Sequence, residues 1–149
     1  MAIPKMLNLA GQLGRKKEAS ESRGARVKRS GSPIFHYSAG AIPATTGIEH
    51  LEVATATFVG YRAGVAKKYE PVDFIRVTNN SAENILIYIN GKLVFQVPAG
   101  TIISNDLLGG IWFVALHNVD GTATSADEVK LELQRLPDSA DMEARRNNF

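Results

Sequence analysis

Apolar and polar side chains alternate along several short runs between residues 71 and 136, with the period of two that is typical of a half-buried β-strand. The run 128–135 (EVKLELQR) alternates most cleanly, and we expect Val129, Leu131 and Leu133 to point inward. The other predicted strands are 72–79 (VDFIRVTN), 84–90 (NILIYIN), 92–97 (KLVFQV), 111–118 (IWFVALHN) and 52–61 (EVATATFVGY). The run 111–118 is continuously apolar, which indicates a central strand buried on both faces.

Turn-forming residues separate these runs. Asn90-Gly91 predicts a two-residue hairpin, because a type I′ turn needs positive φ at both central residues, and Asn and Gly tolerate it. The inward positions expected on the returning strand are Leu93, Phe95 and Val97. Residues 101–104 form a short apolar segment, and residues 105–110, which combine Asn, Asp and a Gly pair, are predicted to be a loop.

Five or six short antiparallel strands without a long helix predict an all-β fold. We expect a small antiparallel β-sandwich or jelly-roll-like domain over residues 48–136, with residues 33–47 as a linker. Residues 137–149 are predicted to form a short C-terminal helical tail, because Asp138 suits an N-cap and the charges run from acidic to basic.

The distribution of charge divides the chain into two parts. The 17 Lys and Arg and 15 Asp and Glu give a net charge of only +2. Residues 1–32, however, hold 8 basic and 2 acidic side chains, a net of +6, so the other residues carry 9 basic and 13 acidic ones, a net of −4. Within this segment, residues 11–32 are rich in Gly, Ser, Lys and Arg and have no aromatic side chain. Residues 1–32 are therefore predicted to be an extended basic arm that orders only against a partner.

The chain offers little material for catalysis or metal binding. It has no cysteine, its three histidines (His36, His50 and His117) are scattered, and no serine lies in a G-x-S-x-G pattern. Neither glycine pair stands between a strand and a helix, where it would cradle a phosphate. We therefore expect no catalytic residue, no metal, no cofactor and no small-molecule substrate. The N-terminus lacks the apolar core of a signal peptide and no run reaches the ~20 apolar residues of a membrane span, so intracellular synthesis and no membrane partner are expected.

Two short motifs around the predicted hairpin carry a resemblance to a known group of proteins. They are Val77–Ser81 (VTNNS), which ends one strand, and Val97–Thr101 (VPAGT), which follows the hairpin; the last strand is Val129–Arg135. This arrangement resembles small β-sandwich proteins in the virions of tailed phages and other viruses: minor capsid, cement, penton or tail-connector subunits. The resemblance covers less than half of the chain. It implies a non-enzymatic structural protein of the virion, whose partners are copies of itself and neighbouring virion proteins.

Two ends of the chain are predicted to make the contacts with these partners. The expected contact residues of the arm are Met6, Leu7, Leu9, Leu13, Arg15, Lys16, Lys17, Arg23, Arg26, Lys28 and Arg29. Those of the tail are Arg145, Arg146 and Phe149. One alternative is a nucleic-acid-associated protein whose arm binds phosphates, including packaged nucleic acid. The other is a carbohydrate- or ligand-binding sandwich, which needs exposed aromatic side chains; we expect Trp112, the only tryptophan, to be packed in the core instead.

Overall fold

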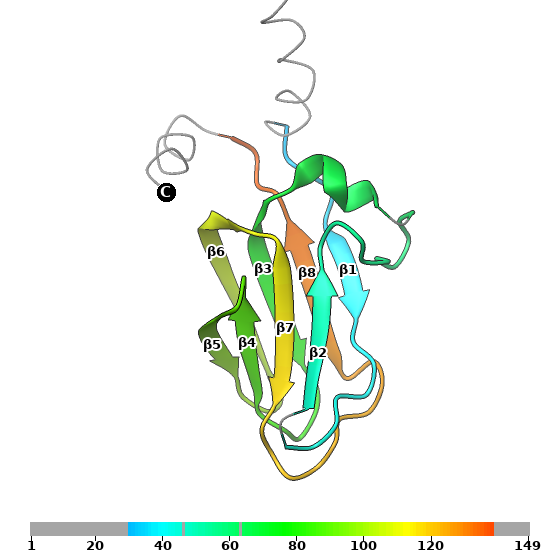
Figure 1. Cartoon of the computed structure of the whole chain (residues 1–149), viewed down its shortest axis with the longest axis vertical. Helices are drawn as coiled ribbons and strands as arrows, with labels where there is room; N and C mark the ends of the chain where they lie inside the picture. Colours follow the sequence, from blue (N-terminus) through cyan, green and yellow to red (C-terminus); the bar gives the residue numbers. More distant parts are fainter. Residues whose placement is uncertain (1–29, 46, 63, 139–149) are drawn as a thin grey trace, which may run out of the picture.

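The computed structural model describes residues 30–45, 47–62 and 64–138, which form two four-stranded antiparallel sheets packed face to face (Figure 1). The strands are β1 (Phe35–Ser38), β2 (Gly47–Glu52), β3 (Val72–Asn79), β4 (Ile85–Ile89), β5 (Lys92–Val97), β6 (Thr101–Ile111), β7 (Phe113–Asn118) and β8 (Val129–Gln134). A short 3-10 helix, η1 (Val65–Tyr69), precedes β3. The predicted all-β sandwich is confirmed. Residues 1–29 of the basic arm and the C-terminal tail beyond Asp138 lie outside the described residues.

The two sheets have the orders β1-β8-β3-β6 and β2-β7-β4-β5. Strands pair in a nested way: β4 with β5, β3 with β6, β2 with β7 and β1 with β8, so the first half of the sandwich folds back along the second. Because β1 runs antiparallel to β8, with Phe35 opposite Leu133, the chain enters and leaves the sandwich at the same end.

The alternating runs supply the core between the sheets. Val129, Leu131 and Leu133 of β8 are buried, as predicted, and they belong to the same core cluster as the buried isoleucines of β4, Ile85, Ile87 and Ile89. The predicted turn at Asn90-Gly91 is also confirmed, with φ of 52° and 84°. Where one face of a strand is exposed to solvent, the alternation of apolar and polar residues in the sequence therefore identifies the buried face.

The predicted strand over 52–61 is wrong. The strand β2 ends at Glu52, whose carbonyl accepts hydrogen bonds from the amides of Thr55 and Ala56, so the chain turns there. Val53 and Phe58 lie in this loop and are buried. Their burial explains why the segment has apolar positions although it is not a strand. Residues 33–47, predicted to be a linker, contain the strand β1.

The predicted loop over 105–110 is also wrong, because these residues lie in the long strand β6. Asn105 and Asp106 are tolerated there because β6 is at the edge of its sheet and both are exposed. Its end depends on Gly110, which has a φ of 87° and whose backbone approaches Pro71 so closely that a Cβ would lie 2.6 Å from the Pro71 Cβ.

Leu93, predicted to point inward, is 55% exposed. The register of β5 against β4 shifts between Ile87 and Tyr88: Ile87 pairs with Phe95, whereas Tyr88 pairs with Leu93. The extra residue, Val94, forms a bulge, and a shift of one residue moves a side chain to the other face of a sheet. Leu93 thus lies beside Tyr88 on the outer face, while Val97 is buried as predicted.

Candidate functional site

The contact residues predicted for the arm and the tail all lie outside the described residues. The structure nevertheless fixes the place from which both segments start. Ser32 and Arg135 lie side by side at the end of the sandwich where β1 begins and β8 ends: the Ser32 amide donates to the Arg135 carbonyl at 2.8 Å, and the Arg135 amide donates to the Ser32 hydroxyl at 2.8 Å. Both terminal segments therefore leave the body from one point.

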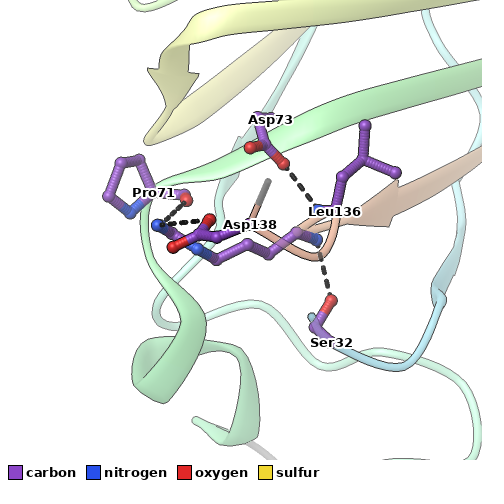
Figure 2. A network of polar contacts seen from close by, with 6 residues as sticks. Ser32, Pro71, Asp73, Leu136 and Asp138 are labelled. Atoms are coloured by element: carbon purple, nitrogen blue, oxygen red, sulfur yellow. Dashed lines mark hydrogen bonds and ion pairs between the residues drawn. The ribbon is translucent and has the colours of Figure 1, made fainter. Parts of the chain in front are cut away.

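A buried arginine holds this point together (Figure 2). The side chain of Arg135 is 9% exposed; its Nη1 donates to the Pro71 carbonyl at 2.9 Å, and its Nη2 lies 3.7 Å from Oδ1 of Asp138. The Leu136 amide donates to the carboxylate of Asp73, which is itself buried, at 2.8 Å. The network joins the end of β8 to the start of β3.

The outer face of the β2-β7-β4-β5 sheet carries a second feature, a well with a volume of about 320 Å³. Its floor is the methyl group of Ala115, in the middle of β7, which pairs with His50 of β2 on one side and Tyr88 of β4 on the other. Phe113 and His117 stand two residues before and after Ala115 on the same strand, so four rings surround one small side chain. We call this feature the ring-walled well; the rest of its lining is Ile48 and Gly91.

The walls of the ring-walled well are held in place by local contacts. The rings of Tyr88 and His117 pack with their centroids 5.9 Å apart and a tilt of 52°. The Phe113 ring lies against Gly91, where a Cβ would come within 3.9 Å of it. The Nε2 atom of His117 is buried and makes no hydrogen bond to any of the described residues. The well is thus mainly aromatic and apolar, with the imidazole of His50 exposed at its edge.

Trp112, the residue before Phe113, contradicts its predicted burial, because it is 50% exposed. It occupies the corner between β6 and β7, where its amide and that of Phe113 both donate to Oδ1 of Asn90, and its carbonyl accepts from the Val53 amide. The continuous apolar run 111–118 concealed this: Val114 and Leu116 are buried, whereas Phe113 on the opposite face is 38% exposed. Every second side chain of the run changes from large (Phe113) to small (Ala115) to large (His117). This alternation in size was the signal that the sequence contained.

The two lateral sides of the sandwich differ. On the β1/β2 side, the Val59 amide donates to the His36 carbonyl at 2.7 Å, and the Tyr37 hydroxyl of β1 donates to Glu49 of β2 at 2.8 Å. On the β5/β6 side, no described strand pairs with the outer edge of β5 or β6. Exposed apolar side chains lie along it: Leu93 and Val94 of β5, and Ile102 of β6, which is 64% exposed. We call these the covered side and the open side.

The pKa of one ionisable group, Tyr37, is perturbed at the covered side. Burial, followed by the hydrogen bond to Glu49 and its negative charge, raises the pKa of Tyr37 to about 12. Among the described residues, no group of three or more His, Asp or Glu is placed to hold a metal ion. No helix within the described ranges has the length and apolar character needed to cross a membrane.

Comparison of the sequence with protein-family models and with curated proteins finds no match.

Proposed function

We propose that this protein is a non-enzymatic structural subunit of a virus particle, a capsid or tail accessory protein whose basic arm orders against neighbouring subunits. The observation that carries the proposal is the nested pairing of eight strands, β1 with β8 through β4 with β5. This order is that of a jelly roll, an architecture used by viral capsid proteins as well as by lectins and cupins.

The surface of the body supports an assembly subunit rather than an isolated module. Unpaired strand edges are templates for pairing with another chain, and proteins that remain single usually block them. The open side instead presents Leu93, Val94 and Ile102 to solvent. Together with the arm of net charge +6 and the remainder of −4, this surface favours contacts between unlike parts of identical subunits.

The place where the arm begins supports the same proposal. Ser32 makes two hydrogen bonds with Arg135, and its carbonyl also accepts from the Gln134 side chain at 3.3 Å. These hydrogen bonds fix the described residues from which the arm and the tail continue. The protein is accordingly proposed to be made in the host cytoplasm and to reside in the virion.

The experiment that tests this proposal removes charge from the arm and leaves the body unchanged. In the full-length variant, glutamine replaces Arg15, Lys16, Lys17, Arg23, Arg26, Lys28 and Arg29. Sedimentation velocity and electron microscopy should show oligomers or particles with the parent chain, and much weaker assembly with the variant. A matched control replaces Lys67 and Lys68 of η1 by glutamine, because both are exposed on the body. A parent chain that stays monomeric at every soluble concentration, alone and with the other virion proteins, contradicts the proposal.

The charge of the arm also favours a second candidate, a nucleic-acid-associated protein. Binding of phosphates by six or more cations predicts that affinity for duplex DNA falls by about three decades or more between ~50 and ~200 mM salt. Fluorescence anisotropy with the parent chain and the neutralised variant measures this fall. A response that is flat, or equal in both proteins, contradicts nucleic-acid binding by the arm and leaves the protein contact.

A further inference from the structure

The strand β6 has an outer edge that no described strand pairs with. Its register with β3 is regular from Thr101 to Asp106, and the irregularity lies beyond Asp106. Proteins hinder pairing at such edges with Lys, Pro, bulges or short strands. The neighbouring edge strand, β5, has both Lys92 and a bulge at Val94, whereas β6 contains neither Lys nor Pro over its 11 residues. The backbone of β6 is therefore suited to pairing with another strand.

The register with β3 assigns the side chains of β6 to two faces. Ile103 and Asn105 lie opposite two fully buried residues of β3, so they are on the face toward the core. Ile103 and Leu107 pack against the core, and Asn105 between them is exposed. Ser104 and Asp106 alternate with these residues on the outer face, and both are exposed. The edge thus carries one amide between two apolar side chains on one face, and a hydroxyl and a carboxylate on the other.

This order of side chains is self-complementary in one antiparallel register. When a two-fold axis joins two edges into a continuous sheet, directly opposite residues lie on the same face. With Asn105 on the axis, Ile103 of one copy lies opposite Leu107 of the other, and the two amides meet. Ser104 then lies opposite Asp106, so its hydroxyl can donate to the carboxylate. The two Asp106 carboxylates are not opposite each other, and like charges do not face across the strands.

A shift of the axis by one residue removes the match. An axis at Ser104 places Ile103 opposite Asn105, an apolar side chain against an amide. An axis at Asp106 places two carboxylates directly opposite each other, which is destabilising. A single asparagine in an otherwise apolar seam fixes the register of coiled coils, and Asn105 has the corresponding position between Ile103 and Leu107 here.

We propose that two copies of this chain pair antiparallel along β6, with Asn105 of each copy at the two-fold axis. The β1-β8-β3-β6 sheets of the two copies then form one continuous sheet. The same contact brings the exposed Leu93 and Val94 of β5 toward the second copy, because β5 and β6 lie at the same side of the sandwich (Figure 1). The inference rests on the proposed function, since it names one of the contacts that join identical subunits.

The first test uses an introduced cysteine, because the natural chain has none. Directly opposite residues of an antiparallel pair have Cα atoms ~4.5–5.5 Å apart, which is within the range of a disulfide. In full-length Asn105→Cys, oxidised glutathione should therefore link two copies, and non-reducing electrophoresis should show a dimer. The matched control for random collision is Ala126→Cys, at an exposed alanine in the loop before β8, which should stay monomeric on the gel.

Two further cysteine variants measure the register. In Ser104→Cys or Asp106→Cys alone, each introduced thiol is diagonal to its own copy, ~7–8 Å away, so little disulfide should form. In an equimolar mixture of the two variants the thiols are directly opposite, and the yield of linked dimer should be several times higher. No other register gives a high yield both for this mixture and for Asn105→Cys.

A charge variant tests the same contact without a covalent bond. Asn105→Asp places two carboxylates at the axis, and Asn105 is exposed in the monomer, so the fold is retained. The dimer dissociation constant measured by sedimentation equilibrium should rise about 10-fold, which corresponds to ~1.4 kcal/mol. The matched control is Asn80→Asp, at an exposed asparagine directly after β3, which should associate as the parent does.

Several outcomes overturn the inference. If the chain associates but Asn105→Cys forms no more disulfide than Ala126→Cys, the subunits meet elsewhere and only the proposed function survives. If the mixture of Ser104→Cys and Asp106→Cys gives no more dimer than either variant alone, the register is wrong. If the introduced thiol of Asn105→Cys is protected from alkylation in a monomer, another part of the same chain covers β6. A chain that is monomeric under all conditions removes the inference and the proposed function together.

Discussion

The covered side and the open side of the sandwich are built from the same kind of strand, and they differ in the connections that the chain makes next to them. Beside the covered side, residues 53–71 form a long connection between β2 and β3, which passes over the edge of β1 and leaves Val59 bridged to His36. Beside the open side, the strands are joined only by Asn90-Gly91 and residues 98–100. These short turns contain too few residues to cover the edge of a sheet.

Because of this difference, we expect the covered side to contribute to the stability of the fold and the open side to association with other subunits. The long connection carries Phe58, Tyr61 and Tyr69, whose rings pack on Phe35 with centroid distances of 5.2, 5.3 and 5.9 Å. The open side has no equivalent cluster among the described residues, and Ile102 there is 64% exposed. Substitutions at the covered side should therefore change the free energy of unfolding, and those at the open side should change the contacts with neighbours.

The largest expected effect comes from Phe35→Ala, at the centre of the aromatic cluster. Phe35 is fully buried, so truncation leaves a cavity and should lower the free energy of unfolding by about 3–5 kcal/mol in urea denaturation. The matched change at the open side, Ile102→Ala, should stay within about 0.5 kcal/mol because the side chain is already in water. Equal losses in the two variants would remove the distinction between the sides.

The next effect tests the network at the origin of the terminal segments. Arg135→Leu leaves Asp138 and the Pro71 carbonyl without the guanidinium in a buried setting, and should cost about 3 kcal/mol by urea denaturation. The control is Arg76→Leu, because Arg76 pairs with Glu132 at 3.3 Å but its side chain is 47% exposed. An exposed pair contributes at most about 1 kcal/mol. A small loss for Arg135→Leu, similar to that of Arg76→Leu, would mean that the network does not hold β8 to β3.

The strands with one wet face could be predicted from the sequence, and those of the covered side could not. Val129, Leu131 and Leu133 alternate with polar residues, and Asn90-Gly91 is a turn signal that needs no tertiary information. The strand β1 escaped prediction because four residues are too few to show a period. Its existence depends on pairing with β8, far along the chain.

The candidate site was hidden for a related reason. The ring-walled well arises from three strands, β2, β7 and β4, whose register brings His50, Ala115 and Tyr88 into one row. No local pattern encodes that row. The exposure of Trp112 likewise follows from the corner that Asn90 and Val53 hold, and the apolar run around Trp112 pointed to the opposite conclusion.

The smallest expected effect concerns the polar link between β1 and β2 across the covered side. Tyr37→Phe removes the hydroxyl that donates to Oε1 of Glu49, which retains the Gly40 amide as a donor at 3.2 Å. The loss should be about 1 kcal/mol near neutral pH, the net contribution of one hydrogen bond.

The pH dependence gives this last prediction a sharper form. Because the pKa of Tyr37 is raised from 10.0 to about 12, the folded protein holds the phenolic proton more tightly than the unfolded chain does. The stabilisation is therefore fully present below pH 10 and is lost as the pH rises from 10 toward 12. Urea denaturation of the parent and of Tyr37→Phe across this window should show that the difference between their free energies of unfolding shrinks with rising pH. The parent loses the stabilisation by the protonated Tyr37 hydroxyl, which the variant lacks at every pH. A difference that stays constant would mean that the Tyr37 hydroxyl ionises with its ordinary pKa, and that the link across the covered side is made by the backbone bridge between His36 and Val59 and by packing alone.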